Sequence, residues 1–292
     1  MKHLEDMIAV VTGASRGGGR GIALALADEG ATVYITGRSV RGSSTRPDLG
    51  DATIDSTAEQ VAARGGVGIP VRCDHTDDDQ VAELFDRIRV EQVRIDLLVN
   101  NVWGGYEEYG NDAAFDREFW DQPLRRWDGM FAAGVRAHFV ASQHAARMMI
   151  PQKRGMIVNT TFWDRGKVLT NLPYDVAKSA VNRSVYNMGL ELRKHGIAAV
   201  GISPGWMRTE AVLRHFDLPV DDSVRDLPPE LARTESVLYI GRAVAALARD
   251  SNVIEKSGKV FPVGDLAREY GFTDVDGSQP PAYRMADEDL RD

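Results

Sequence analysis

The chain has 292 residues, with 35 Lys or Arg against 43 Asp or Glu, so its formal net charge is −8 at pH 7. This acidic balance argues against a nonspecific binder of nucleic acid or anionic membrane, because both need a basic field, although a small anionic cofactor needs only a few local positive groups. The 43% of apolar residues suffice for a substantial core, and the length leaves one or two domains open.

The N-terminal residues lead through a short apolar run into a glycine-rich turn, which is not the layout of a signal peptide. The longest apolar stretches fall well short of the roughly 20 residues of a membrane helix. A single cysteine, Cys73, excludes an internal disulfide and a cysteine zinc cluster and suits a reducing compartment. We therefore expect a cytoplasmic protein.

Short runs rich in β-branched and apolar residues alternate with segments of helical spacing. This alternation predicts an α/β fold, a doubly wound (Rossmann) parallel sheet of about seven strands with helices on both faces. Because no linker divides the pattern, we expect one domain over 1–292, with a core of about 7–265 and a polar C-terminal extension over 266–292. The predicted strands are Met7–Thr12, Ala31–Thr36, Gly66–Cys73, Ile95–Asn100, Gly155–Thr161, Ile197–Ser203 and Val260–Val263.

The first predicted strand runs into the turn Gly13-Ala-Ser-Arg-Gly-Gly-Gly19, which opens a helix rich in Ala and Leu. A pyrophosphate needs close backbone approach and the exposed N–H groups of a helix start, and glycines at 13, 17 and 19 permit both. The strand, turn and helix supply the context that a dinucleotide motif requires. The alternative is a purely structural turn.

The second predicted strand ends at Arg38, where a domain that selects NAD usually carries an acidic side chain. Arg38 and Arg16 together suit a 2′-phosphate dianion, so the sequence favours NADP over NAD. Arg38 could instead be a solvated loop residue. The polar segment 39–56 is longer than most connections, and its Arg41 and Arg46 could extend the positive patch.

Tyr174 and Lys178 are spaced i and i+4 in a predicted helix that begins after Pro173, so they share one face. A nearby ammonium stabilises a phenolate and lowers the pKa of a tyrosine, which suits it to proton transfer at neutral pH. By itself this spacing is common, and a surface pair would be the better interpretation.

Five motifs occur in an order and spacing that resemble the short-chain dehydrogenase/reductase family. The resemblance covers about residues 7–265, and three further segments, 34–38, 119–128 and 257–271, resemble one subgroup of that family. The five motifs are Thr12-Gly-x-x-x-Gly17-x-Gly19, Asp74 after the third strand, Asn100-Asn101, Tyr174-x-x-x-Lys178 and Pro204-Gly-Trp-Met-Arg-Thr209.

The resemblance implies an NADP(H)-dependent oxidoreductase that transfers hydride between the nicotinamide and a carbonyl or secondary alcohol. Tyr174 would be the general acid and base, and Lys178 would bind the ribose hydroxyls and tune Tyr174. The family also suggests a homodimer or homotetramer, through helices beginning near Tyr109 and at Tyr174. The implied cofactor residues are Gly13, Ser15, Arg16, Gly17 and Gly19 at the phosphates and ribose, Thr36 to Arg38 for NADP preference, Asp74 at the adenine, Asn101 with Val102 at the adenosine, and Met207 and Thr209 at the carboxamide.

Two positions depart from the family pattern. Gly134 stands where the family usually has an asparagine that anchors a proton-relaying water. The usual catalytic serine falls at Thr161 or Phe162, and we assign the polarisation of the carbonyl to the Thr161 hydroxyl. These departures raise the alternative of a catalytically weakened NADPH-binding sensor or scaffold, against which the retained Tyr174 and Lys178 weigh.

Tryptophans at 103, 163 and 206 each follow a motif at the carboxyl end of a predicted strand, where doubly wound sheets bind ligands. They favour a flat or hydrophobic carbonyl substrate, or else they pack loops. The aromatic segment 106–127 is equally open between a substrate wall and core or interface packing. The six histidines show no paired-ligand spacing, so we expect no metal site.

Overall fold

A computed structural model describes residues 2–106, 115, 117–163, 167, 171–219 and 227–285. Seven strands form one sheet in the order β3-β2-β1-β4-β5-β6-β9, and all six pairings are parallel. This confirms the predicted fold class. The strands are β1 (Ile8–Thr12), β2 (Thr32–Gly37), β3 (Val67–Arg72), β4 (Leu97–Asn100), β5 (Gly155–Thr160), β6 (Ile197–Ser203) and β9 (Val260–Pro262).

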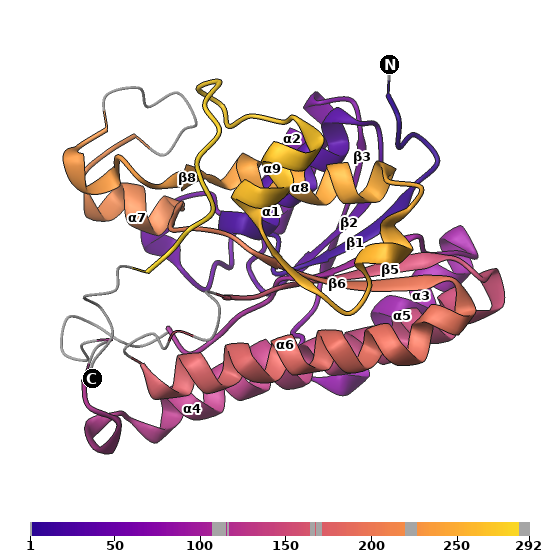
Figure 1. Cartoon of the computed structure of the whole chain (residues 1–292), viewed down its shortest axis with the longest axis horizontal. Coiled ribbons are helices and arrows are strands. Elements are labelled where there is room, and N and C mark those ends of the chain that lie inside the picture. Colours follow the sequence, from indigo (N-terminus) through magenta and orange to yellow (C-terminus); the bar gives the residue numbers. More distant parts are fainter. Residues whose placement is uncertain are drawn as a thin grey trace.

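Helices cover both faces of the sheet (Figure 1). One face carries α1 (Gly17–Asp28), α2 (Ile54–Ala63), α8 (Val237–Arg249) and α9 (Val263–Tyr270). The other carries α3 (Asp78–Gln92), α4 (Leu124–Phe131), α5 (Ala137–Gln152) and α6 (Leu172–Leu192), with a π-helical turn, Ala132–Arg136, between α4 and α5. At the carboxyl edge of the sheet, the short strands β7 (Met207–Arg208) and β8 (Glu235–Ser236) pair beside α7 (Glu210–His215).

The core consists of two layers because successive side chains of a strand point to opposite faces. In β1, Val11 joins the cluster under α1 and α8, whereas Val10 joins the cluster under α3 and α5. Both side chains are fully buried. Burial on both faces explains why the central strands are continuous apolar runs, which made them recognisable in the sequence. Within the described part of the chain, no helix is long and apolar enough to span a bilayer.

A buried carboxylate joins the beginnings of three strands. Asp96, 6% exposed, accepts hydrogen bonds from the Ile8 backbone N–H at 2.9 Å and from Arg154 at 2.6 Å. We expect Asp96→Ala to lower the free energy of unfolding by about 2 kcal/mol, because the buried Ile8 N–H loses its acceptor. Urea denaturation measures this loss. Asp96→Asn retains an oxygen acceptor and should lose less; equal losses in the two variants would contradict this account.

Two segments differ from the sequence prediction. The polar segment 39–56 ends three residues earlier than expected, because α2 begins at Ile54 with the Thr53 hydroxyl accepting from the Ser56 N–H at 3.1 Å. Threonine is a common N-cap residue, so the signal was present in the sequence. Before it, the chain makes an isolated bridge between Val40 and Ser43 and a short 3-10 turn.

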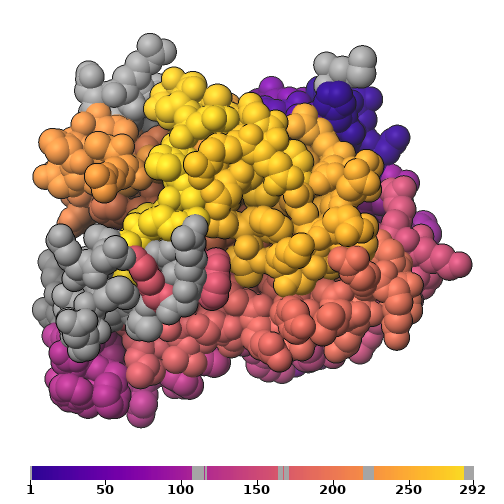
Figure 2. Space-filling view, viewed as in Figure 1, coloured from indigo at the N-terminus to yellow at the C-terminus, as the bar shows by residue number. Residues whose placement is uncertain are grey.

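The predicted polar extension from residue 266 also contains packed structure. Helix α9 continues to Tyr270, and Asp274 is only 2% exposed, with its carboxylate accepting from the Ser236 backbone N–H at 2.9 Å. The Tyr239 hydroxyl of α8 donates to the carbonyl of Pro280 at 3.0 Å. The C-terminal residues up to 285, yellow in Figure 2, form part of the molecular surface on this side. Residues 286–292 of the extension lie outside the described residues.

Candidate active site

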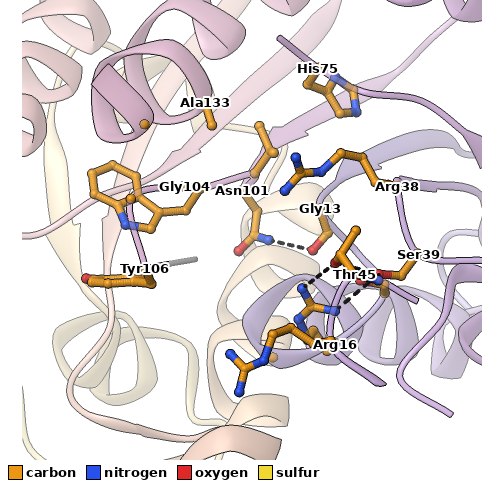
Figure 3. Close-up of a pocket in the computed structure, with 18 of the residues that line it drawn as sticks. Gly13, Arg16, Arg38, Ser39, Thr45, His75, Asn101, Gly104, Tyr106 and Ala133 are labelled. Carbon is orange, nitrogen blue, oxygen red and sulfur yellow. Dashed lines mark hydrogen bonds between the residues drawn. The ribbon is translucent and has the colours of Figure 1, made fainter. Parts of the chain in front are cut away.

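The strand order reverses between β1 and β4, and a cleft of about 650 Å³ lies at the carboxyl ends of these strands (Figure 3). Doubly wound sheets bind ligands at this switch point. Gly13 and Gly17 have φ values of 66° and 58°, a backbone conformation that favours glycine. Of the predicted cofactor residues, those that line the cleft are Gly13, Ser15, Arg16, Gly17, Gly37, Arg38, Asp74, Asn101, Val102 and Thr209.

The start of α1 already binds an anionic group. The Gly17 N–H donates a hydrogen bond of 2.8 Å to Glu210 Oε2, while Glu210 Oε1 lies 3.0 Å from Arg20 Nε. Glu210 is 3% exposed and borders the cleft. A helix start favours negative charge, and this carboxylate shows that the glycine turn accepts one. Glu210 was not predicted, although it directly follows Thr209 in a motif that the sequence analysis had identified.

Two arginines border the cleft from the first turn and from the end of β2. The Arg16 guanidinium donates to Ser39 at 3.3 Å and to Thr45 at 3.2 Å, as Figure 3 shows. Arg38 Nη1 lies 3.9 Å from a carboxylate oxygen of Asp74. The structure therefore brings together the two cations on which the prediction of NADP depends.

The two arginines of the polar segment 39–56 are each paired with an acidic side chain. Arg41 donates to Glu59 of α2 at 2.8 Å, and it is not among the residues that line the cleft. Arg46 lines the cleft but forms two hydrogen bonds to Asp48, at 2.8 and 2.6 Å. Arg41 thus does not add to the positive patch, and the charge of Arg46 is offset by its neighbour.

Side chains at the ends of β1 and β4 fasten the two strands together. The Asn101 amide donates to the carbonyls of Thr12 and Gly13 at 3.2 and 3.1 Å. In return, the Thr12 hydroxyl oxygen accepts from the backbone N–H groups of Asn101 and Val102 at 2.9 and 3.1 Å. These bonds hold the ends of β1 and β4 together beneath the cleft, which Asn101 also lines.

Tyr174 and Lys178 stand one turn apart at the start of α6. The Asn171 side chain caps this helix by accepting from the Tyr174 N–H at 2.9 Å, and Pro173 occupies its first turn. Lys178 Nζ lies 5.6 Å from the centroid of the Tyr174 ring. The predicted pairing of the two side chains on one face is therefore present.

The environment of this pair reverses one expectation. The sequence predicts that the ammonium lowers the pKa of Tyr174, but burial raises that pKa well above its ordinary value. Burial also lowers the pKa of Lys178 to about 7. Both shifts have the same cause, because a site poor in water disfavours the phenolate and the ammonium alike.

Aromatic rings from the chain segments before and after β5 surround the Tyr174 ring. The ring centroids of Trp103, Phe115 and Phe162 lie 5.5, 5.6 and 6.2 Å from that of Tyr174, and Tyr106 contacts both Trp103 and Phe115. We call these five residues the aromatic cluster. Edge and tilted ring contacts of this kind are favourable and pack densely.

The remainder of the aromatic segment 106–127 divides into two groups. Phe119 and Trp120 contact each other and are exposed, while Trp127 stacks on Phe131 with a centroid distance of 4.3 Å. The aromatic segment therefore contributes to the surroundings of Tyr174 only through its first part. Tyr109, where the sequence analysis expected a helix to begin, lies outside the described residues; α4 begins at Leu124.

Thr161 does not face Tyr174. Its hydroxyl donates to Asn182 Oδ1 at 2.7 Å and lies 3.3 Å from the Lys178 carbonyl, so it is directed into α6. The side chain after β5 that contacts the Tyr174 ring is Phe162. A phenyl ring has no hydroxyl with which to polarise a carbonyl, so the expected role of Thr161 would require its bond to Asn182 to break.

Gly134 has a steric explanation. It lies in the π-helical turn, and a Cβ atom at this position would overlap carbons of the Trp103 indole. An asparagine therefore has no room here while the indole keeps this position. Among the residues that the structure describes, no group of three His, Cys, Asp or Glu side chains is placed to hold a metal ion.

Comparisons with known proteins agree with this architecture. Residues 13–255 match a family model described as Enoyl-(Acyl carrier protein) reductase. The chain is 38% identical over 284 residues to Dehydrogenase/reductase SDR family member 1 of Mus musculus, covering 96% of this chain and 87% of that protein, and 37% identical to its Homo sapiens counterpart with the same coverage. The crystal structure of a short-chain type dehydrogenase/reductase from Mycobacterium marinum superposes with a TM-score of 0.69 at 27% identity, covering 88% of this chain and 94% of that one.

Proposed function

Because the chain belongs to the short-chain dehydrogenase/reductase family, as its motifs predicted, we propose that it is an NADP(H)-dependent oxidoreductase acting on a carbonyl or secondary alcohol. The observation that carries this proposal is the pairing of Tyr174 with Lys178, one helical turn apart, against the indole of Trp103, a residue that lines the cleft. A protein that only binds the nucleotide does not need a phenol beside an ammonium.

The cleft fits a phosphorylated dinucleotide. A phosphate would take the place of the Glu210 carboxylate at the Gly17 N–H of this helix start, and Arg16 and Arg38 supply positive charge. When bound, NADPH supplies the hydride. The residues that would hold it are Gly13, Ser15, Arg16, Gly17, Gly19, Arg38, Asp74, Asn101, Tyr174, Lys178, Met207 and Thr209.

The side chains of this protein would then manage one proton. As the substrate carbonyl is reduced, the Tyr174 hydroxyl donates its proton to the carbonyl oxygen, and in the reverse direction the phenolate takes it back. When protonated, Lys178 places a positive charge 5.6 Å from the centroid of the Tyr174 ring, which opposes the effect of burial on the phenolate, and a pKa of about 7 lets Lys178 gain or lose a proton near neutrality. Thr161 would assist by polarising the carbonyl, provided that its hydroxyl turns away from Asn182.

The aromatic cluster supports a hydrophobic substrate with a flat ring, since apolar and aromatic walls bind such molecules by excluding water. The proposal includes one domain over 1–292 and a cytoplasmic location. It also includes a homodimer or homotetramer, for which the exposed Phe139 of α5 and the exposed Tyr186 and Leu190 of α6 offer apolar contact surface.

A direct assay tests the function. We expect the purified protein to consume NADPH, followed by its absorbance, with cyclic aromatic ketones, quinones or steroid-like ketones, at a kcat/KM at least about tenfold above that for small polar carbonyls. Reactions without carbonyl, and with NADH in place of NADPH, are the controls. Tight NADPH binding with no turnover across the panel would instead support the sensor or scaffold alternative.

A further inference from the structure

The indole of Trp103 lies between two residues of the site. Lys178 Nζ stands 3.6 Å from the centroid of this indole, over its face, and the Trp103 ring also makes an edge contact with Tyr174 at 5.5 Å. An ammonium over the face of tryptophan is attracted by the ring quadrupole, and the attraction is strongest where water is absent. Trp103 therefore contacts both members of the proposed acid and base pair.

The indole is the main contact of the Lys178 ammonium. Lys178 is only 8% exposed, and among the described residues its ammonium makes no hydrogen bond and no ion pair. The titratable groups that face it are Tyr174 on its own helix and His138 on α5. Burial lowers the pKa of His138 to about 3, so that ring is neutral. A buried ammonium needs compensation, and the indole face supplies it.

Gly134 admits the indole to this position. Any side chain at 134 would overlap ring carbons of Trp103, and the turn that carries Gly134 is π-helical, an irregularity common at functional sites. The indole is thus confined between the backbone of the turn and the ammonium. The indole of Trp103 can take this position only because residue 134 has no side chain.

We propose that Trp103 is a positioning residue: its indole face, admitted by Gly134, holds the Lys178 ammonium beside Tyr174 and keeps water from it. The contact between Trp103 and Lys178 does not depend on any reaction, whereas its effect on catalysis rests on the proposed function. The Trp103 ring occupies the space between Lys178 and position 134, where water could otherwise stand. Lys178 therefore exchanges protons through Tyr174 and the bound cofactor rather than through solvent at position 134.

The contact is tested first without substrate or cofactor. The tryptophan emission of the wild type, titrated from about pH 5.5 to 9, should show a step centred near pH 7, because burial lowers the pKa of Lys178 to about 7 and its charge lies over the indole. The step should vanish in Lys178→Met and in Trp103→Phe. It should persist in Trp120→Phe, a matched control at a 68% exposed tryptophan.

Three outcomes of this titration overturn the proposal: no step in the wild type, a step that survives in Lys178→Met, or a step that survives in Trp103→Phe. None of these results depends on turnover, so the contact can fail while the proposed function stands, and the contact can hold while no carbonyl is reduced.

The effect on catalysis is tested by comparing Gly134→Ala in the wild type and in a Trp103→Ala background. Gly134→Ala should lower kcat with NADPH and the best carbonyl about tenfold in the wild type, because the new Cβ displaces the indole from Lys178. In a Trp103→Ala background the same change should cost less than about twofold, since the three heavy atoms nearest to the added Cβ all belong to the indole. Trp103→Phe, which retains a ring face, should keep more activity than Trp103→Leu. Equal costs of Gly134→Ala in both backgrounds, or equal activity of the Phe and Leu variants, would overturn the positioning role.

Discussion

Tyr174→Phe is expected to lower the rate of hydride transfer about a thousandfold while changing the affinity for NADPH less than about threefold. The substitution removes only the hydroxyl. The contacts of the ring with Trp103, Phe115 and Phe162 stay available to phenylalanine, so the packing at the start of α6 should remain. Without the phenol, the alkoxide that develops on the substrate has no positioned proton donor, and the effect should appear in kcat rather than in KM.

The measurement is the loss of NADPH absorbance at saturating carbonyl, together with NADPH binding by fluorescence titration and the melting temperature of each variant. Tyr186→Phe is the matched control, because Tyr186 lies on the same helix but is 44% exposed. It should retain the rate of the wild type. If Tyr174→Phe keeps more than about a tenth of the activity, the phenol is not the proton donor and the proposed mechanism is wrong.

Features that depend on short stretches of chain were predictable. The central strands are buried on both faces, so they appear in the sequence as uninterrupted apolar runs, and the glycine turn after β1 sits between a strand and a helix as its motif requires. The positions of Tyr174 and Lys178 follow from helical periodicity alone. The family to which these local motifs pointed is the one that the comparisons show.

The surroundings of Tyr174 were not predictable in this way. Burial raises its pKa. The rings that contact it come from different parts of the chain, with Trp103 and Phe115 before β5 and Phe162 after it, and no local pattern predicts that they converge. Likewise, the direction of the Thr161 hydroxyl depends on Asn182, which lies 21 residues further along the chain. The role of Gly134 became visible only when the structure placed the indole against it.

The choice of cofactor leads to the second large effect. We expect Arg38→Ala to weaken NADPH binding about a hundredfold and to leave NADH binding within about threefold, because the two cofactors differ only by the 2′-phosphate. Arg38 lies 3.9 Å from Asp74, and this carboxylate orients the guanidinium toward the cleft. Arg16 is tied to Ser39 and Thr45, so its substitution would also loosen the loop, which makes Arg38 the cleaner position.

Arg41→Ala is the control for this experiment, because Arg41 is paired with Glu59 and lies outside the residues that line the cleft. It should bind both cofactors as the wild type does. Dissociation constants should also be measured at two salt concentrations. NADPH binding should weaken with salt more steeply in the wild type than in Arg38→Ala, because the variant lacks one of the cations that face the 2′-phosphate. An equal loss for NADPH and NADH would show that Arg38 supports the cleft rather than the 2′-phosphate. Tighter binding of NADH than of NADPH by the wild type would contradict the preference for NADP itself.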